Sequence, residues 1–308
     1  MSVAEPTVAR LPSPWLRHLL ATRPAFLSLT LVGCLLGLAC AAVDGQFHAP
    51  IAALVSLTLA LAIHAGANVI NDVHDAEGDA INTRRLYPFT GGSRMIQNGV
   101  LTTGQMARLG HALLLLPIPA GLWLVGHSAP GLLAIGMTGL LLAWAYSAPP
   151  LRLSARGLGE PAIALTWLLV VVGCDFVQRQ SFALTPLAAG AGFALLVANV
   201  LYIAQFPDAD ADATSGKRTL VVRLGPARAR LGYPLIVLFA HGTPLAMILT
   251  GHLPPLALLA LVSLWPGLWA TRLLWHDGVT ASTIRLTIAA AASHGLLLAA
   301  ALVASASA

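Results

Sequence analysis

Long apolar stretches separated by polar connections extend over the whole chain. Each stretch is close to the roughly 20 residues that a bilayer-spanning helix needs and is rich in Leu, Ala and Val. Nine such stretches are present, at residues 24–43, 50–71, 106–126, 129–147, 158–176, 182–204, 231–250, 253–274 and 282–306. Unbroken apolar runs favour helices over the alternating pattern of a membrane barrel. The pattern therefore predicts an all-α integral membrane protein, a bundle of about nine transmembrane helices forming a single domain over residues 1–308.

The polar connections differ in length between the two faces of the membrane. Residues 1–23 precede the first stretch, and the two longest connections, 72–105 and 205–230, follow even-numbered stretches, so all three segments lie on one face. The connections on the other face are short and serve mainly as turns. We therefore expect the residues capable of chemistry on one face, with 72–105 and 205–230 as active-site loops.

Charge predicts the orientation of the chain. Only 9% of the residues are charged and 57% are hydrophobic, whereas soluble domains are roughly a quarter charged, so a soluble globular protein is excluded. Of the 17 basic residues, all except Arg179 fall on the face that carries residues 1–23. Because basic residues mark the cytoplasmic side, we expect the N-terminus and active site in the cytoplasm, at a bacterial inner membrane. Topology accounts for the basic excess, so we expect membrane lipid and no nucleic acid as a partner.

Two acid-rich patches interrupt the apolar pattern, at the ends of the second and sixth stretches. A helix presents the amide and three carboxylates of the first patch on one face, since their spacing is i, i+4, i+7 and i+11. These residues are Asn68, Asp72, Asp75 and Asp79, and Asp208 and Asp212 of the second patch repeat the i, i+4 spacing. Like charges at this spacing repel unless a cation binds them. Since Mg²⁺ prefers a few carboxylates with phosphate oxygens, the patches predict a site for about two or three Mg²⁺ ions and a diphosphate.

Other interpretations of the acids stay open at this point. A single Asp beyond the end of a span is equally well explained by solvation, and Glu77 and Asp210 fall off the shared faces and are expected in solvent. His74 is expected as a hydrated residue, and Asp175 and Arg179 as a local ion pair on the opposite face. A secondary transporter also holds carboxylates in the membrane, but near its midplane, and a scaffold leaves two like-charged stripes unexplained.

Cations near both patches suit phosphate binding. Arg94 lies in the glycine-rich run 91–99 after the first patch, and Lys217, the only lysine, follows the second together with Arg218. Guanidinium groups bind phosphate oxygens bidentately, and glycines let the backbone approach a ligand. Membrane topology alone is the alternative explanation for these basic residues.

A third polar connection on the same face contains paired prolines at 149–150. Tyr146 precedes them and Arg152 follows them. Because prolines break the helix, the chain is able to turn both side chains toward a cavity between the helices. Interfacial anchoring is the alternative explanation for the tyrosine.

Taken together, these motifs resemble the UbiA superfamily of intramembrane aromatic prenyltransferases. That family carries N-x-x-x-D-x-x-D-x-x-x-D near the second helix and D-x-x-x-D near the sixth, matched here by Asn68 to Asp79 and by Asp208 and Asp212. The segment from Tyr146 to Arg152 is similar to the family's tyrosine–basic motif. The resemblance covers essentially the whole chain, and it implies a helical bundle around a central apolar cavity with a polar cap on the cytoplasmic face.

The resemblance also implies an activity, the Mg²⁺-dependent transfer of a polyprenyl group from polyprenyl diphosphate to an aromatic acceptor. The implied metal ligands are Asp72, Asp75, Asp79, Asp208 and Asp212, with Asp72, Asp75, Asp208 and Asp212 catalytic. The implied substrate-binding residues are Asn68, Asn71, Arg94, Tyr146, Arg152, Lys217 and Arg218. Metal and cations would neutralise the leaving diphosphate, and an apolar chamber would keep the allylic cation from water.

Within the family, three sequence segments bear on the identity of the acceptor. Two of them favour one acceptor and the third favours another. The run from Gly216 to Gly225 and the segment 157–160 resemble the branch that prenylates 1,4-dihydroxy-2-naphthoate in menaquinone synthesis. The compact first motif, with three residues between Asp75 and Asp79, is closer to enzymes that prenylate 4-hydroxybenzoate. We expect the naphthoate acceptor, with 4-hydroxybenzoate or another aromatic acceptor as the alternative.

Overall fold

All regular structure in residues 4–306, the part that the computed structural model describes, is helical, as predicted. The long helices are α2 (Pro24–Val43), α3 (Pro50–His74), α8 (Gly159–Arg179), α9 (Leu184–Thr214), α12 (Gly232–Leu249) and α14 (Ala281–Ala306). The shorter helices are α1 (Pro14–Ala21), α4 (Ala76–Ile81), α5 (Thr103–Leu115), α6 (Pro117–His127), α7 (Gly131–Ala145), α10 (Leu220–Leu224), α11 (Pro226–Ala229) and α13 (Leu264–His276). Two 3-10 helices, η1 (Ser154–Arg156) and η2 (Pro255–Ser263), complete the described set.

Eight helical stretches in the described residues are long and apolar enough to cross a membrane. Three of these are consecutive helices that continue one another, namely α5 with α6, α11 with α12, and η2 with α13. Helix α7 is also apolar but has only 15 residues. In chain order, these elements correspond to the apolar stretches of the sequence, so the all-α bundle is confirmed.

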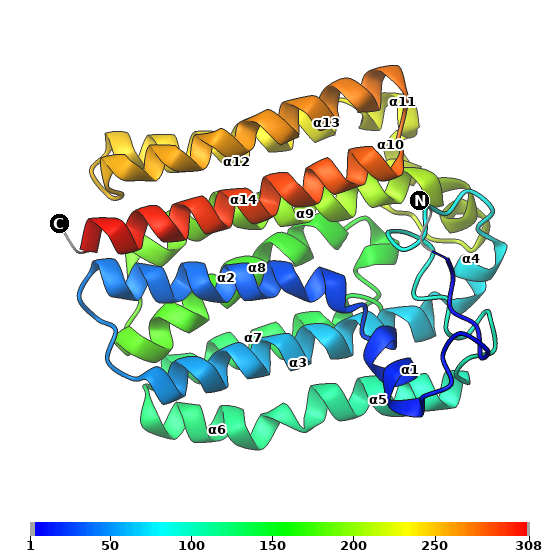
Figure 1. Cartoon of the computed structure of the whole chain (residues 1–308), viewed down its shortest axis with the longest axis horizontal. Helices are drawn as coiled ribbons and strands as arrows, with labels where there is room; N and C mark the ends of the chain where they lie inside the picture. The colour runs from blue at the N-terminus through cyan, green and yellow to red at the C-terminus, as the bar shows by residue number, and fades with distance from the viewer. Residues whose placement is uncertain (1–3, 307–308) are drawn as a thin grey trace.

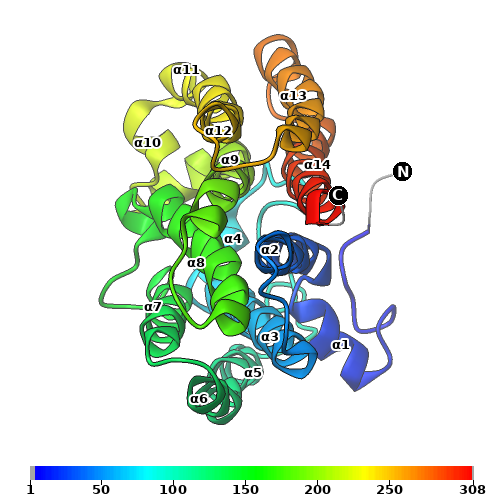
Figure 2. The same ribbon diagram turned by 90° about the vertical axis from the view of Figure 1, so that its left-hand side faces the viewer.

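The spanning helices lie side by side along the longest axis of the molecule (Figure 1). Seen along that axis, α3, α5, α6 and α7 lie on one side and α9, α12, α13 and α14 on the other, with α2 and α8 between them (Figure 2). Helix α2 packs against α8 and α14, and α8 packs against α9. The connections 75–102, 146–158 and 215–231 meet at one end, beside α1, α4, α10 and α11, and we call this the loop-rich end (Figure 1).

Helices α3 and α9 continue beyond the predicted ends of their apolar stretches. Helix α9 runs ten residues past residue 204, with Pro207 inside it, so the first part of the expected loop 205–230 is helical. The alternating Ala and Asp residues after Pro207 explain this, because alanine is the strongest helix former even where polarity ends an apolar run. The α3 helix ends at His74, and the chain resumes as α4 after one residue. Both acid patches therefore lie on helices or at their ends.

Glycines set the closest helix contacts in the bundle. A Cβ atom at Gly37 of α2 would overlap the main-chain oxygen of Val171 in α8 and lie 2.9 Å from Cβ of Cys174. At Gly192 of α9, a Cβ atom would overlap the main-chain oxygen of Ala240 in α12. Small residues at such crossings let membrane helices approach closely, which supplies the dispersion contacts that hold them together in lipid.

Candidate active site

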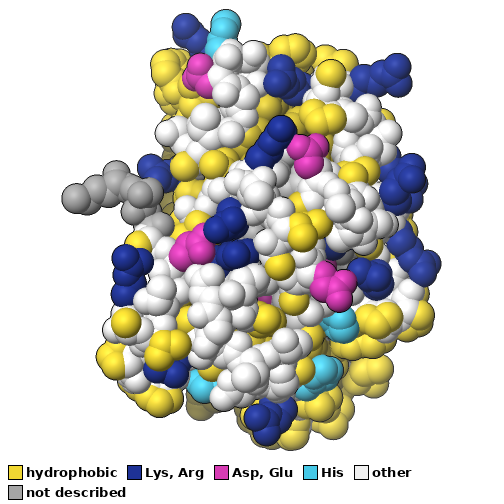
Figure 3. All heavy atoms as spheres, turned by 90° about the vertical axis from the view of Figure 1, so that its right-hand side faces the viewer, with side chains coloured by type: hydrophobic (Ala, Val, Ile, Leu, Met, Phe, Trp, Pro, Cys, Tyr) yellow, Lys and Arg dark blue, Asp and Glu magenta, His cyan; other side chains and the backbone are white. Residues whose placement is uncertain are grey.

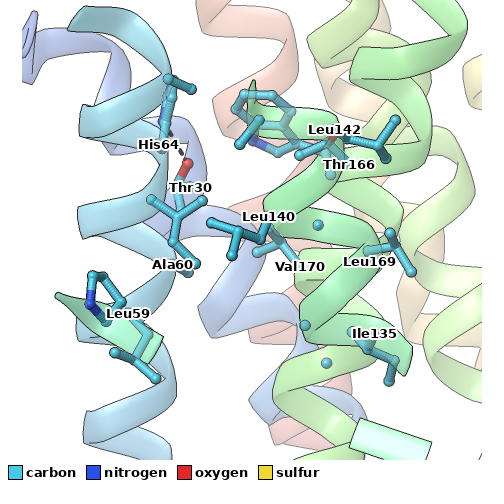
Figure 4. A pocket seen from close by; sticks show the side chains of 18 of the residues that line it. Thr30, Leu59, Ala60, His64, Ile135, Leu140, Leu142, Thr166, Leu169 and Val170 are labelled. Carbon is cyan, nitrogen blue, oxygen red and sulfur yellow. Dashed lines mark hydrogen bonds between the residues drawn. The ribbon is translucent and has the colours of Figure 1, made fainter. Parts of the chain in front are cut away.

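An apolar cavity of about 410 Å³ lies inside the bundle. Side chains from α2, α3, α6, α7, α8 and α9 line it, and most of them are aliphatic. Figure 4 shows part of this lining, including Leu140 and Leu142 of α7 and Leu169 and Val170 of α8. The central apolar cavity implied by the resemblance is therefore present.

Polar groups in the cavity are few. His64 and Thr30 share a hydrogen bond of 2.7 Å between Nδ1 and Oγ1 (Figure 4), and the ring of His64 meets Trp167 edge-on with 5.0 Å between centroids. Asn68, Asn71 and Tyr146 also line the cavity, near the ends of α3 and α7. The cavity thus has an apolar body and polar groups toward the loop-rich end.

Asp72 is the most buried acid of the first patch. Its side chain is at the end of α3, and the residue is 3% exposed. One carboxylate oxygen, Oδ2, accepts a hydrogen bond of 3.1 Å from the main-chain nitrogen of Ser93. The other oxygen, Oδ1, is buried without a hydrogen-bond partner among the described residues. A buried carboxylate oxygen left in this way is costly unless a ligand binds it.

Lys217 joins the two acid patches. Its Nζ atom lies 2.8 Å from Oδ2 of Asp75 and 3.4 Å from Oδ1 of Asp212. Burial of the ammonium group opposes its charge, but the carboxylates of Asp75 and Asp212 outweigh burial and raise the pKa of Lys217. The residue is therefore a charged group at neutral pH, held between α3 and α9.

Two asparagines hold carboxylates of the patches in place. Asn71 donates from Nδ2 to Oδ2 of Asp75 at 2.7 Å and to Oγ of Ser147 at 2.9 Å. Asn82, in the connection after α4, donates from Nδ2 to Oδ1 of Asp208 at 2.6 Å. These contacts connect the ends of α3, α7 and α9, and they fix the carboxylates before any ligand binds.

The glycine-rich connection runs directly against the acids. Gly91 and Gly92 both have positive φ, 75° and 73°, which glycine adopts without steric cost. A Cβ atom at Gly92 would overlap Oδ2 of Asp79 and lie 3.1 Å from Oδ1 of Asp72. Only a residue without a side chain therefore fits here, and the backbone forms one wall of a space between the two carboxylates.

The donor set fits a divalent cation that is completed by a substrate. In the described part of the chain, no three acid, His or Cys side chains converge closely enough to hold an ion alone. The unpartnered oxygen of Asp72 and the space that Gly92 leaves beside Asp79 nevertheless suit a cation. Burial, and then the charges of Asp72 and Asp75, raise the pKa of Asp79 to about 8, as expected for crowded carboxylates without a counter-ion. Mg²⁺ commonly combines one or two carboxylates with phosphate oxygens and water.

The other predicted cations occupy different positions. Arg94 is buried, donates from Nη1 to the main-chain oxygen of Asp79 at 2.6 Å, and has Nε 3.6 Å from Oε2 of Glu5. Arg152 and Arg218 are exposed, and neither lines the cavity. The structure thus brings Lys217 and Tyr146 together with the acids and the cavity, whereas Arg94 holds the loop, and the two exposed arginines lie outside.

The residues that were expected to lie away from the site do lie away from it. Glu77 is exposed, and Asp210 is exposed and pairs with Arg84 at 2.9 Å. Arg179 pairs with Asp175 at 2.8 Å at the opposite end of the bundle, which confirms the predicted local ion pair.

The sequence patterns did not predict four residues that lie at the site: Glu5, Arg23, Asn82 and Ser93. Asn82 and Ser93 lie in a polar connection, where no periodicity marks one polar side chain above another. Arg23 lines the cavity from the residue before α2, and in the sequence it reads only as one more basic residue on the cytoplasmic face. Its position directly before Pro24, the first residue of a span, was the one feature of the sequence that could have marked Arg23 as a site residue.

Charged side chains of both signs gather at the loop-rich end. Figure 3 looks onto this end and shows basic side chains around and between the acidic ones. The two acid patches lie at this end of α3 and α9, not in the middle of the membrane-spanning stretches. Their position differs from the midplane carboxylates that a secondary transporter requires.

Comparison with known proteins agrees with this arrangement. The sequence profile of the UbiA prenyltransferase family matches residues 30–287. The chain is 30% identical to a 1,4-dihydroxy-2-naphthoate octaprenyltransferase of Escherichia coli over 81% of this chain and 77% of that enzyme. It is 28% identical to a 2-carboxy-1,4-naphthoquinone phytyltransferase of Synechocystis over 84% of this chain and 82% of that enzyme. The fold is similar to that of a UbiA homolog from Archaeoglobus fulgidus bound to DMAPP and Mg²⁺, with a TM-score of 0.68, 17% identity, and coverage of 94% of this chain and 99% of that one.

Proposed function

From the premise that this chain belongs to the UbiA prenyltransferase family and is a multi-pass membrane prenyltransferase, we propose that it transfers a polyprenyl group to 1,4-dihydroxy-2-naphthoate. The donor is a polyprenyl diphosphate, the reaction depends on Mg²⁺, and the product enters menaquinone synthesis. The acceptor and the metal are proposed by analogy with relatives whose names carry naphthoate or naphthoquinone, and with a homolog bound to DMAPP and Mg²⁺.

One observation carries the proposal: two facing acid patches joined by Lys217 lie at the polar end of an apolar cavity. This arrangement suits a substrate with an anionic head and a long apolar tail. A diphosphate fits the head site, because it brings oxygens for a metal and accepts hydrogen bonds from a lysine. A prenyl chain fits the apolar body of the cavity.

Mg²⁺ would be held by the carboxylates of the two patches together with the diphosphate. We assign this role to Asp72, Asp75, Asp79, Asp208 and Asp212, of which Asp72 has a buried oxygen free for it. The bound metal would supply electrophilic stabilisation of the negative charge that develops on the leaving diphosphate.

The chain's own residues perform the remaining tasks. Lys217 donates to the diphosphate as the allylic carbon–oxygen bond breaks and its electron pair remains on the leaving group. The apolar lining excludes water, so the allylic cation survives until a ring carbon of the acceptor forms the new carbon–carbon bond. That ring carbon then loses its proton to the released diphosphate, and the ring becomes aromatic again. Asn71 and Asn82 hold Asp75 and Asp208 in place, which lowers the cost of organising the site during reaction.

The orientation follows from charge. The loop-rich end carries the N-terminal segment and all basic residues except Arg179, so we assign it to the cytoplasm of a bacterial cell and the bundle to the inner membrane. Membrane lipid is then the solvent of the exposed apolar surface and the source of the prenyl donor.

The proposal is tested with purified protein in lipid nanodiscs, labelled farnesyl diphosphate, and a choice of acceptors. We expect Mg²⁺-dependent formation of prenylated naphthoate, loss of at least roughly a thousandfold in rate in Asp72→Ala and Asp208→Ala, and thermal melting that shows both variants folded. In competition at limiting donor, 4-hydroxybenzoate should give the minor product. Product from 4-hydroxybenzoate alone would overturn the acceptor, and normal turnover of either variant would overturn the metal site.

A further inference from the structure

One cation lines the apolar cavity, within electrostatic range of Asp72 at the polar end. Arg23 is the only charged residue among the described residues that line it. Its guanidinium group lies over the ring of Phe26, with Cζ 4.8 Å from the centroid, and Nη2 donates to the main-chain oxygen of Phe89 at 3.2 Å. The guanidinium is thus held by the ring of Phe26 and the main-chain oxygen of Phe89, just before the start of α2.

Arg23 differs from the cations beside the acids because no carboxylate in the described chain pairs with it. Lys217 is paired with Asp75 and Asp212, and Arg85 and Arg94 are both paired with Glu5. The Nε atom of Arg23 is buried and has no acceptor in residues 4–306. A buried donor on a charged group is costly to leave unpaired, so this position is prepared for an anion that the chain does not supply.

The backbone at Arg23 is also held in an unusual conformation. Its φ and ψ are 54° and 58°, in the left-handed region that residues other than glycine rarely adopt. Asn68 of α3 donates from Nδ2 to the main-chain oxygen of Thr22 at 3.0 Å and so secures the residue before it. Backbone strain that the surrounding structure maintains is typical of residues whose direction matters for function.

The proposed reaction brings two anions to this cavity, the diphosphate and the acceptor carboxylate. The diphosphate has its own cation, Lys217, and its own carboxylates on α3, α4 and α9. A planar aromatic acid instead matches a guanidinium that lies over the ring of Phe26 in a cavity also lined by Phe89, since arginine binds a carboxylate through two parallel hydrogen bonds.

We propose that Arg23 binds the carboxylate of the aromatic acceptor and selects for acids over acceptors that lack this group. The proposal rests on the proposed function and names the acceptor subsite within it. Arg152, which the resemblance implied as a substrate-binding residue, is exposed and does not line the cavity.

The test compares Arg23→Gln and Arg23→Lys with Arg108→Gln, a matched control on the exposed surface of α5. Each full-length protein in nanodiscs is assayed with 1,4-dihydroxy-2-naphthoate and with 1,4-dihydroxynaphthalene, which lacks the carboxylate. With Arg23→Gln we expect the acceptor KM to rise at least about tenfold for the acid and less than about twofold for the diol, with the donor KM unchanged. Arg23→Lys should recover part of the loss, and Arg108→Gln should match the wild type.

Equal losses with both acceptors would overturn the proposal, because they would mean a structural role. A raised KM for the prenyl diphosphate would overturn it in favour of diphosphate binding, and wild-type values for Arg23→Gln would exclude any role. Equilibrium binding of the acid and the diol, followed by their fluorescence without donor, tests the subsite independently of turnover. If the wild type makes no prenylated product yet binds the acid more tightly than the diol, and Arg23→Gln removes that difference, the proposed function fails while the carboxylate subsite stands.

Discussion

Lys217 is held by two carboxylates from different helices, and this position gives it a role that its charge alone does not require. A basic residue that served only topology would not need a buried side chain within 2.8 Å of Asp75. When a diphosphate arrives, the ammonium group is already placed where the acids converge. We therefore expect Lys217 to contribute more to donor binding than to acceptor binding.

The corresponding variant is Lys217→Met, with Lys217→Arg as the control that keeps the charge. We expect the KM for prenyl diphosphate to rise roughly tenfold to a hundredfold, because a lost charge-assisted contact costs about 1–3 kcal/mol. The acceptor KM should change little. Initial rates over a range of donor concentrations measure the effect, and an unchanged donor dependence would assign Lys217 to topology alone.

The raised pKa of Asp79 predicts that metal binding depends on pH. Its pKa of about 8 exceeds the ordinary value of 3.8, so the folded, metal-free protein binds a proton that the unfolded chain releases. The free energy of unfolding contributed by this group therefore falls as pH rises from about 4 to about 8. Because Mg²⁺ binds the carboxylate and competes with that proton, its affinity should rise over the upper part of the same range.

This prediction is checked by thermal melting of the protein in detergent at pH 6 and pH 8.5, with and without Mg²⁺. The stabilisation by Mg²⁺ should be larger at pH 8.5 than at pH 6. In Asp79→Asn, which has no proton to exchange there, the two pH values should give more similar stabilisation. A wild-type response independent of pH would contradict the role of Asp79 as a metal ligand.

Single residues also differ in how far the sequence determines their place. The continuous helix face expected for Asn68 to Asp79 is interrupted at Asp75, between α3 and α4. The meeting of the two acid patches was predictable, because both were expected at one face of the membrane, and Lys217 does join Asp75 to Asp212. The contacts of the arginines were not predictable from the sequence, because a long side chain reaches partners that only the tertiary structure brings near. Arg94 is held by Glu5, which is 89 residues earlier in the chain by residue number.

At the scale of helices, the pair α2 and α8 depends on the absence of a side chain at Gly37. We expect Gly37→Leu to push the helices apart, because the added atoms would occupy the place of the main-chain oxygen of Val171. Such overpacking typically costs about 1–3 kcal/mol, so the melting temperature in detergent should fall by several degrees. Gly126→Leu on α6, where a Cβ atom meets nothing within 4 Å, is the control. Equal melting temperatures would show that α2 is free to shift.

Helix ends were harder to predict than helix existence, for a physical reason. Hydropathy detects where the lipid ends, whereas a helix ends where its backbone hydrogen bonds end, and the two differ by ten residues in α9. The extension places Asp208 and Asp212 on a rigid helix rather than in a loop. The break at Asp75, between α3 and α4, is another local feature that spacing did not reveal.

At the scale of the whole molecule, one wall of the cavity is also part of the outer surface. Leu122 of α6 and Leu133 and Met137 of α7 line the cavity and are 56%, 44% and 62% exposed. Exposed apolar residues on spanning helices face lipid in a membrane protein. The cavity volume of about 410 Å³ lies within the range of about 300–1,000 Å³ that holds a single drug-sized ligand, so a long prenyl chain must extend beyond it.

We expect the prenyl tail of the donor to leave the cavity between α6 and α7, and a substitution at Gly139 of α7 tests this. Gly139 lines the cavity, and a Cβ atom there meets nothing within 4 Å, so Gly139→Phe places a ring in open space without disturbing helix packing. We expect kcat/KM for octaprenyl diphosphate to fall roughly tenfold relative to geranyl diphosphate, since forcing apolar groups into occupied space costs about 1–3 kcal/mol. Gly126→Phe on α6, which does not line the cavity, should leave the ratio unchanged. Equal losses for both donors in Gly139→Phe would place the exit elsewhere, because a ring that blocks the path of the tail must discriminate by tail length.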